Sequence, residues 1–187
     1  QGGSPGYISL IATEVYNGQV IIAGQAPKKW TGDHLTGQWD YLRDPTLSDS
    51  FPLGVTNAYS HMKTFGGLLW IVGQLKVNPL TSATKQFGIA TWDGSGIALI
   101  TPPGWAGVSD DEIIQTGEDP PIGNCLAVGD IGDGNGDRLY AGGRPNIGGT
   151  PVVVKTTSGW QGFGGSGLTG ECKSLSIVND PAGGYVL

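Results

Sequence analysis

Residues 134–142 read GNGDRLYAG, which is a glycine-rich turn, a short apolar run and a closing glycine. Three other segments share this order: 16–24 (YNGQVIIAG), 65–73 (FGGLLWIVG) and 181–187 (PAGGYVL), the last of which stops before a closing glycine. Glycine and asparagine accept the positive φ angles of tight hairpin turns, and the apolar runs have the length of strands. The pattern therefore predicts a β-hairpin that recurs four times.

Each predicted turn has further strand-like segments on both sides. A preceding strand is expected at 8–15, 55–63, 124–128 and 173–178. Third and fourth strands are expected at 29–32 and 38–42, at 87–94 and 97–100, and at 151–160 and 162–164. Each third strand carries a tryptophan at a similar position, which indicates packing between neighbouring units, and these residues are Trp30, Trp92 and Trp160.

The spacing of the repeats predicts an architecture. The closing glycines at 24, 73 and 142 are 49 and 69 residues apart, and a four-stranded unit that recurs at roughly 45–50 residues is typical of a β-propeller blade. We expect an all-β propeller of four-stranded meander blades, with repeats at about 7–54, 55–122, 123–170 and an incomplete 171–187. An insertion at 104–121, with a helical turn or two at 109–114, lengthens the second repeat. A β-sandwich is the second choice.

Composition excludes several classes of protein. Glycine accounts for 34 of the 187 residues and proline for 12, far above the usual share of about 7% for glycine, which disfavours a helical fold. The net charge is −6 and no basic cluster is present, so a nucleic acid partner is not expected. No apolar run approaches the roughly 18 residues of a membrane-spanning helix, so no membrane span is expected.

One part of the chain resembles a known family. Residues 126–128 (LAV), 139–143 (LYAGG), 165–170 (GSGLTG) and 89–94 (IATWDG) resemble the ALAV, LYVGG, LGSGLNG and IARWDG motifs of bacterial and phage β-propeller repeats. The resemblance implies a propeller and leaves its activity open, because propellers host many functions. Related propellers form tail or surface parts of virus particles. We therefore expect a non-catalytic structural or interaction module of an extracellular surface or a virion, with protein subunits as partners.

Closure of the propeller needs more blades than these repeats provide. A ring typically contains about four to eight blades, and an open stack leaves strand edges exposed for pairing. We therefore expect either that the chain is part of a longer protein or that other subunits complete the ring.

The loop at 130–137 (DIGDGNGD) is the strongest candidate metal site. Acidic and amide side chains that alternate with glycines can turn several hard oxygens toward one Ca²⁺, and the loop resembles those of integrin-type FG-GAP propeller repeats. The departure from that pattern is Arg138, which stands near the place of a last carboxylate. The alternative is a solvated hairpin turn. The candidate ligands for calcium are Asp130, Asp133, Asn135 and Asp137.

The insertion supplies a candidate binding site. Trp105 has no counterpart in the other repeats, and it can either stack on a sugar or a partner protein or pack inside the molecule. Asp110, Asp111 and Glu112 can supply paired carboxylates toward a glycan, although adjacent acids on a loop are more often simply solvated. The alternative function is therefore a secreted carbohydrate-binding or carbohydrate-active protein.

Other residues give little support to catalysis. The two histidines, His34 and His61, belong to no metal or nucleophile motif, so we expect structural or surface roles and no enzyme activity. Cys125 and Cys172 are 47 residues apart, about one repeat. Equivalent positions on neighbouring blades usually lie beyond the Cα separation of roughly 7 Å that a disulfide tolerates, so buried free thiols are expected.

Overall fold

The computed structural model describes residues 12–23, 27–42, 59–76, 85–100, 123–143, 150–164, 168, 170–180 and 184–186. These residues contain strands and no helix, so the all-β prediction is confirmed.

Every strand pairing is antiparallel, and each four-stranded sheet is a simple meander. The first sheet contains β1 (Ala12–Tyr16), β2 (Gln19–Ala23), β3 (Lys28–Thr31) and β4 (Gln38–Tyr41). The second contains β5 (Tyr59–Phe65), β6 (Leu68–Lys76), β7 (Lys85–Trp92) and β8 (Ile97–Ile100). The third contains β9 (Gly123–Gly129), β10 (Arg138–Gly143), β11 (Val152–Thr156) and β12 (Gly159–Phe163), and a last hairpin joins β13 (Val178–Asp180) to β14 (Gly184–Val186).

The first two hairpins turn as the sequence predicts. Asn17 and Gly18 have φ angles of 48° and 74°, and Gly66 and Gly67 have φ angles of 58° and 76°. Two successive positive φ angles between paired strands define a type I′ turn, whose twist matches that of the strands it joins. Each turn therefore sets the register of the strand residues next to it, in β1 on β2 and in β5 on β6.

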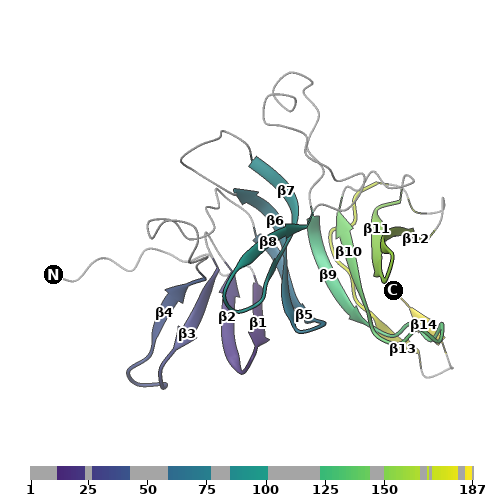
Figure 1. Ribbon diagram of the computed structural model, residues 1–187. Coiled ribbons are helices and arrows are strands. Elements are labelled where there is room, and N and C mark those ends of the chain that lie inside the picture. The colour runs from purple at the N-terminus through teal and green to yellow at the C-terminus, as the bar shows by residue number, and fades with distance from the viewer. Residues whose placement is uncertain are drawn as a thin grey trace.

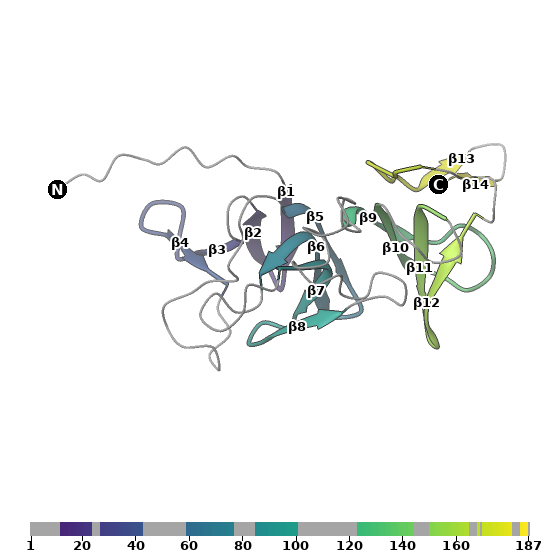
Figure 2. The same cartoon turned by 90° about the horizontal axis from the view of Figure 1, so that it is seen from above.

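The sheets stand in a row. Figures 1 and 2 show the sheets fanning out one after another, with the first strands β1, β5 and β9 side by side. Each new sheet therefore begins beside the first strand of the previous one. The described sheets form an open row, and their closure into a propeller ring stays a prediction.

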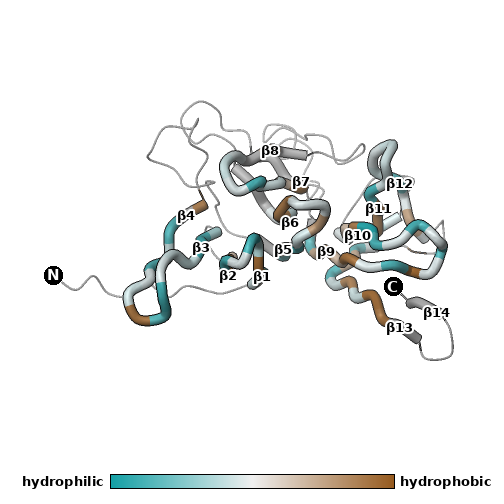
Figure 3. Tube along the Cα trace, turned by 60° about the horizontal axis from the view of Figure 1, so that its bottom comes forward, coloured by the Kyte–Doolittle hydropathy of each residue, from teal (hydrophilic) through white to brown (hydrophobic). Residues whose placement is uncertain are grey.

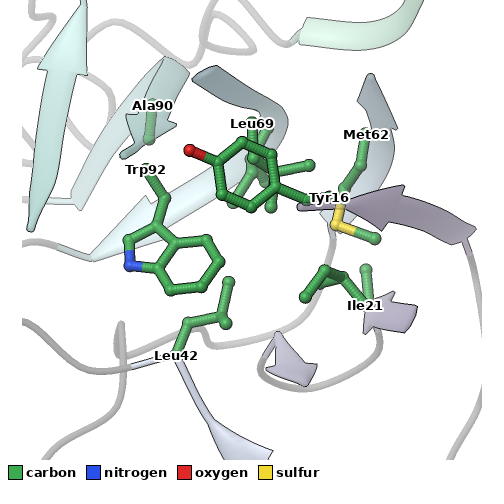
Figure 4. Close-up of a cluster of buried hydrophobic side chains, with 9 residues drawn as sticks. Tyr16, Ile21, Leu42, Met62, Leu69, Ala90 and Trp92 are labelled. Carbon is green, nitrogen blue, oxygen red and sulfur yellow. The ribbon is translucent and has the colours of Figure 1, made fainter. Parts of the chain in front are cut away.

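A hydrophobic cluster fills the space between the first and second sheets (Figure 4). The first sheet contributes Tyr16 and Ile21, and Leu42 follows directly after its last strand. The second sheet contributes Met62 and Trp92. All five side chains are at least 98% buried. Burial of large apolar side chains supplies roughly 1.5–3 kcal/mol each, so this interface is a major source of stability.

Strand β6 shows why the sequence at 65–73 is continuously apolar. Leu69 and Ile71 face the first sheet, whereas Trp70 and Val72 face the third sheet. Successive residues of a strand point to opposite faces, and both faces of the second sheet are covered. A sheet buried on both sides needs unbroken apolar strands in place of alternating ones.

The third sheet is also covered on both faces. Ala127, Tyr140 and Val154 lie on the face away from the second sheet, where Leu175 and Ile177 pack against them. The prediction of a strand over 173–178 is wrong for residues 173–177, which are irregular, and strand β13 begins only at Val178. The reason is that these residues lie against the preceding sheet through side chains and do not form a ladder of their own.

Specific bonds join the first strand of the first sheet to β5 and to the turn that follows β5. The hydroxyl group of Tyr16 donates a hydrogen bond to the carbonyl of Gly67 at 2.9 Å. The hydroxyl of Thr64 donates to the carbonyl of Val15, also at 2.9 Å. Lys63 and Glu14 form an ion pair, with nitrogen and oxygen 3.5 Å apart. These contacts fix how the two strands lie along each other.

The tryptophans follow the expected packing in part. Trp92 lies between the first and second sheets, and Trp160 lies between the second and third, where it meets Trp70 edge to face at 5.9 Å between ring centroids. Trp160 belongs to the fourth strand β12, so its assignment to a third strand is wrong: a turn at 157–158 ends β11 earlier than expected. Trp30 packs on Trp39 within its own sheet.

The hydropathy of the chain follows this layering. In Figure 3, hydrophobic segments lie on strands such as β6 and β11, whereas the loop that joins β3 to β4 is hydrophilic over much of its length. Across the described ranges, we find no helix with the length and apolar character that crossing a membrane requires.

Candidate functional site

A cavity of about 450 Å³ lies where the second and third sheets meet. Three connections of the chain surround it: the β5–β6 turn, the β9–β10 loop and the β11–β12 turn. These connections come together because the two sheets lie face to face and their hairpin turns lie at the same end. The lining residues are Phe65, Gly66, Leu68, Trp70, Asn135, Asp137, Arg138, Lys155, Thr156 and Thr157.

The second sheet supplies the apolar wall of the cavity. Phe65 and Leu68 are half-buried beside the type I′ turn, and Trp70 is 95% buried behind them. The indole nitrogen of Trp70 donates a hydrogen bond to the carbonyl of Phe65 at 3.0 Å. This bond holds the indole ring in place and occupies its only donor, so the wall presents carbon surface.

The third sheet supplies the polar wall. Lys155 donates from Nζ to the carbonyl of Thr156 at 3.0 Å, and the Thr156 hydroxyl donates to the carbonyl of Gly159 at 2.9 Å. Arg138 is paired with Asp133. Arg138 therefore has a counter-charge in the β9–β10 loop, whereas Lys155 contacts a neutral carbonyl.

Asn135 and Asp137 are exposed on the polar wall. An amide and a carboxylate that face a carbon wall can bind the hydroxyl groups of a ligand whose other side is apolar. The arrangement suits a small ligand with one apolar face, and the carboxylate of Asp137 on the polar wall disfavours a strong anion.

The predicted calcium ligands lie on the β9–β10 loop, where their side chains shape turns. A carboxylate oxygen of Asp130 accepts a hydrogen bond from the backbone N–H of Gly132 at 2.7 Å, and one of Asp133 accepts from the N–H of Asn135 at 3.1 Å. Asp and Asn commonly bond to the backbone two residues on. Gly134 has a φ angle of 81°, which this path of the chain requires.

This arrangement does not gather the four predicted ligands around one point. The pKa of Asp133 lies below its ordinary value, first because of the Asn135 side chain, then because of the Asn135 N–H and the Arg138 guanidinium group. In the part of the chain that the structure describes, no group of three or more His, Cys, Asp or Glu residues is placed to hold a metal ion. A calcium ion would have to compete with Arg138 for Asp133, and calcium binding stays a prediction.

The other predicted binding residues, Trp105, Asp110, Asp111 and Glu112, lie outside the described residues, as does the whole insertion at 104–121 and its expected helical turns.

The two histidines have the structural and surface positions expected from the sequence. His34 is exposed in the β3–β4 loop. His61 is half-buried on β5, and its Nδ1 atom accepts a hydrogen bond from the backbone N–H of Leu126 on β9 at 2.9 Å. Burial and the charge of Lys63 lower the pKa of His61, so the ring is neutral and ties the second sheet to the third.

The two cysteines lie in contact, although the repeat spacing predicted a wide separation. The sulfur atoms of Cys125 and Cys172 are 3.8 Å apart, and both residues are free thiols. The expected free thiols are present, although only Cys125 is fully buried. The sulfur atoms lie close together because the segment that carries Cys172 lies against the third sheet itself. Burial, followed by the charge of Cys172 and the hydrogen bond with it, raises the pKa of Cys125 to about 12.

Sequence reasoning did not find the cavity. Its walls come from separate repeats, and no motif joins Phe65 to Lys155 or Thr156. The repeat is the feature of the sequence that could have predicted it. Equivalent turns of consecutive sheets lie at the same end, so their side chains come together.

Comparisons with known proteins do not assign this chain to a family. It matches no protein-family model, and no significant match is found among curated proteins or among solved structures.

Proposed function

We propose that this protein is a non-catalytic β-propeller module that takes part in a larger assembly, on an extracellular surface or in a virion. The observation that carries the proposal is the side-by-side arrangement of β1, β5 and β9, the first strands of three consecutive four-stranded meanders. In a propeller, the first strands of the blades converge on a central axis and each blade packs its face on the next. The clusters on both faces of the second sheet support this interpretation.

The proposal requires further blades to complete a ring, and protein subunits are the partners that would supply them where the same chain does not. Val15 and Val20, which pair across the β1–β2 hairpin, support a contact at this edge, since 59% and 44% of their surfaces are exposed. Apolar side chains that remain exposed side by side are candidates for burial in an interface. The acidic, glycine-rich composition and the resemblance to phage repeats support the location.

Light scattering and electron microscopy of the purified protein test this proposal. We expect ring-shaped particles with sheets that radiate from a central axis. Particles without a central axis would overturn the propeller and favour the β-sandwich alternative.

A second candidate function is binding of a small carbohydrate in the cavity between the second and third sheets. Its carbon wall of Phe65 and Leu68 faces the polar side chains of Asn135 and Asp137 across about 450 Å³. Sugars present one apolar face and several hydroxyl groups, and binding cavities are commonly apolar with a few polar groups that fix orientation. This candidate keeps the protein non-catalytic and gives it a glycan partner.

Saturation-transfer NMR with neutral mono- and disaccharides tests the second candidate. We expect the substitutions Phe65→Ala and Asp137→Asn each to weaken binding at least tenfold. Leu35→Ser serves as the matched control, because Leu35 is 81% exposed on the β3–β4 loop and does not line the cavity. Binding that both cavity variants retain would exclude this cavity as the carbohydrate site.

A further inference from the structure

We propose that Cys125 and Cys172 form a reversible disulfide that joins the third sheet to the beginning of the next repeat. The two sulfur atoms are 3.8 Å apart although the residues are 47 positions apart in the chain. The bonded separation is about 2.05 Å, so the two side chains have to rotate toward each other for the bridge to form.

The backbone holds Cys172 in this position. Its N–H donates a hydrogen bond to the carbonyl of Gly143 at 2.8 Å. The side chain of Asn124, the residue before Cys125, donates to the carbonyl of Cys172 at 3.1 Å and to the carboxylate of Glu171 at 2.8 Å. The approach of the two thiols is therefore set by several bonds that do not involve sulfur.

The residue below the two sulfurs is a glycine. A Cβ atom on Gly142 would lie 2.6 Å from the sulfur of Cys172 and 2.7 Å from that of Cys125. Gly142 pairs in register with Cys125 across β9 and β10. Any larger residue at this position would push the sulfurs away, so the absence of a side chain creates the space that the pair occupies.

The two thiols differ in access, which sets the order of the reaction. Cys172 is half-buried, whereas Cys125 is buried and its pKa is raised to about 12. The oxidant is a small external disulfide such as oxidised glutathione. The thiolate of Cys172 attacks one sulfur of that disulfide, breaks its S–S bond and releases one small thiol.

The second step closes the bridge. Cys125 gives its proton to water and attacks the sulfur of Cys172, and the second small thiol leaves. Two protein thiols are thus oxidised while one small disulfide is reduced to two thiols. Because burial disfavours the thiolate of Cys125, this step is the slower one and accelerates as pH rises.

The test uses the full chain in its folded state. The protein is incubated with oxidised glutathione, quenched with acid, alkylated with N-ethylmaleimide and measured by intact mass and peptide mapping. We expect loss of both alkylatable thiols and a linked peptide pair that contains Cys125 and Cys172. Dithiothreitol should restore both thiols.

Two single variants separate this reaction from non-specific oxidation. Cys125→Ser should stop at the mixed disulfide of Cys172 with glutathione, and Cys172→Ser should leave Cys125 at least tenfold slower to react than Cys172 in the wild type. Circular dichroism confirms that each variant is folded. A wild type that keeps glutathione on Cys172, or that links the two cysteines only in urea, would overturn the proposal.

Discussion

The ring of Tyr16 lies against the ring of Trp92, with 5.3 Å between the ring centroids and 48° between the planes. Tyr16 ends the first strand of the first sheet, and Trp92 ends the third strand of the second sheet. The two rings therefore form a direct contact between these two sheets. The hydroxyl group of Tyr16 also donates a hydrogen bond to the carbonyl of Gly67 in the β5–β6 turn.

Substitutions of Tyr16 separate the contribution of the ring from that of the hydroxyl group. Tyr16→Phe removes one hydrogen bond and should lower the free energy of unfolding by about 0.5–1.5 kcal/mol. Tyr16→Ala also removes the buried ring and should lower it by about 3–5 kcal/mol. Urea unfolding gives both values, and Val15→Ala, at an exposed position, is the control and should change stability by less than about 0.5 kcal/mol. Equal effects of the two Tyr16 substitutions would contradict the packing role of the ring.

The stability of the folded chain should fall in mild acid because of His61. Its pKa is lowered from an ordinary value of 6.5, so the unfolded chain takes up a proton at a higher pH than the folded one. The contribution of His61 to the free energy of unfolding is present above pH 6.5. It is lost as the pH falls through the pKa of His61 in the folded state. Lys63 adds to the lowering of the pKa, and Glu14 opposes it.

Thermal unfolding between about pH 5 and 8 measures this effect. His61→Asn offers an amide oxygen as an acceptor for the Leu126 N–H without a titrating group, so its melting temperature should change less over this range than that of the wild type. Identical profiles for the two proteins would exclude His61 as the cause.

Gly142→Ala should destabilise the third sheet. The new Cβ atom would meet both cysteine sulfurs closer than atoms normally approach, and overpacking of this kind costs about 1–3 kcal/mol. Denaturant unfolding under reducing conditions measures the loss. A triple variant that also carries Cys125→Ala and Cys172→Ala lacks both sulfurs, so Gly142→Ala should lower the free energy of unfolding less in this background. An equal loss in both backgrounds would show that the new Cβ atom does not act through the sulfurs.

Calcium binding by the β9–β10 loop is testable through Arg138. If the carboxylates hold Ca²⁺, then Arg138→Gln frees Asp133 from its ion pair and should increase the rise in melting temperature that Ca²⁺ produces. Extracellular calcium modules bind with dissociation constants of about 10⁻⁴–10⁻³ M, so a ligand concentration ten times higher stabilises by about 1.4 kcal/mol. Asp133→Asn in the Arg138→Gln background should abolish the gain. Equal melting temperatures with and without millimolar Ca²⁺ in both proteins would exclude the site.

Local features of the fold could be predicted from the sequence. The turns at Asn17-Gly18 and Gly66-Gly67 depend on residues that tolerate positive φ angles, and unbroken apolar runs indicate strands buried on both faces. These signals involve neighbours in the chain, so periodicity detects them.

Contacts between sheets were harder to predict. The sequence predicts a strand over 173–178, but nothing in the local sequence indicates that residues 173–177 pack on the preceding sheet. For the same reason the sequence revealed neither the contact of Cys125 with Cys172 nor the cavity beside Trp70. Each depends on how two repeats meet, which composition and spacing do not encode.

The row of sheets also determines how the molecule responds to a pulling force. The second sheet adheres to one neighbour through the cluster around Trp92 and to the other through the cluster around Trp160, so the two interfaces bear tension in series. The weaker interface should rupture first and leave the other intact. Trp92 is buried in one of these interfaces, whereas Trp70 and Trp160 are buried in the other, so fluorine-labelled indoles would report, separately, which junction opens.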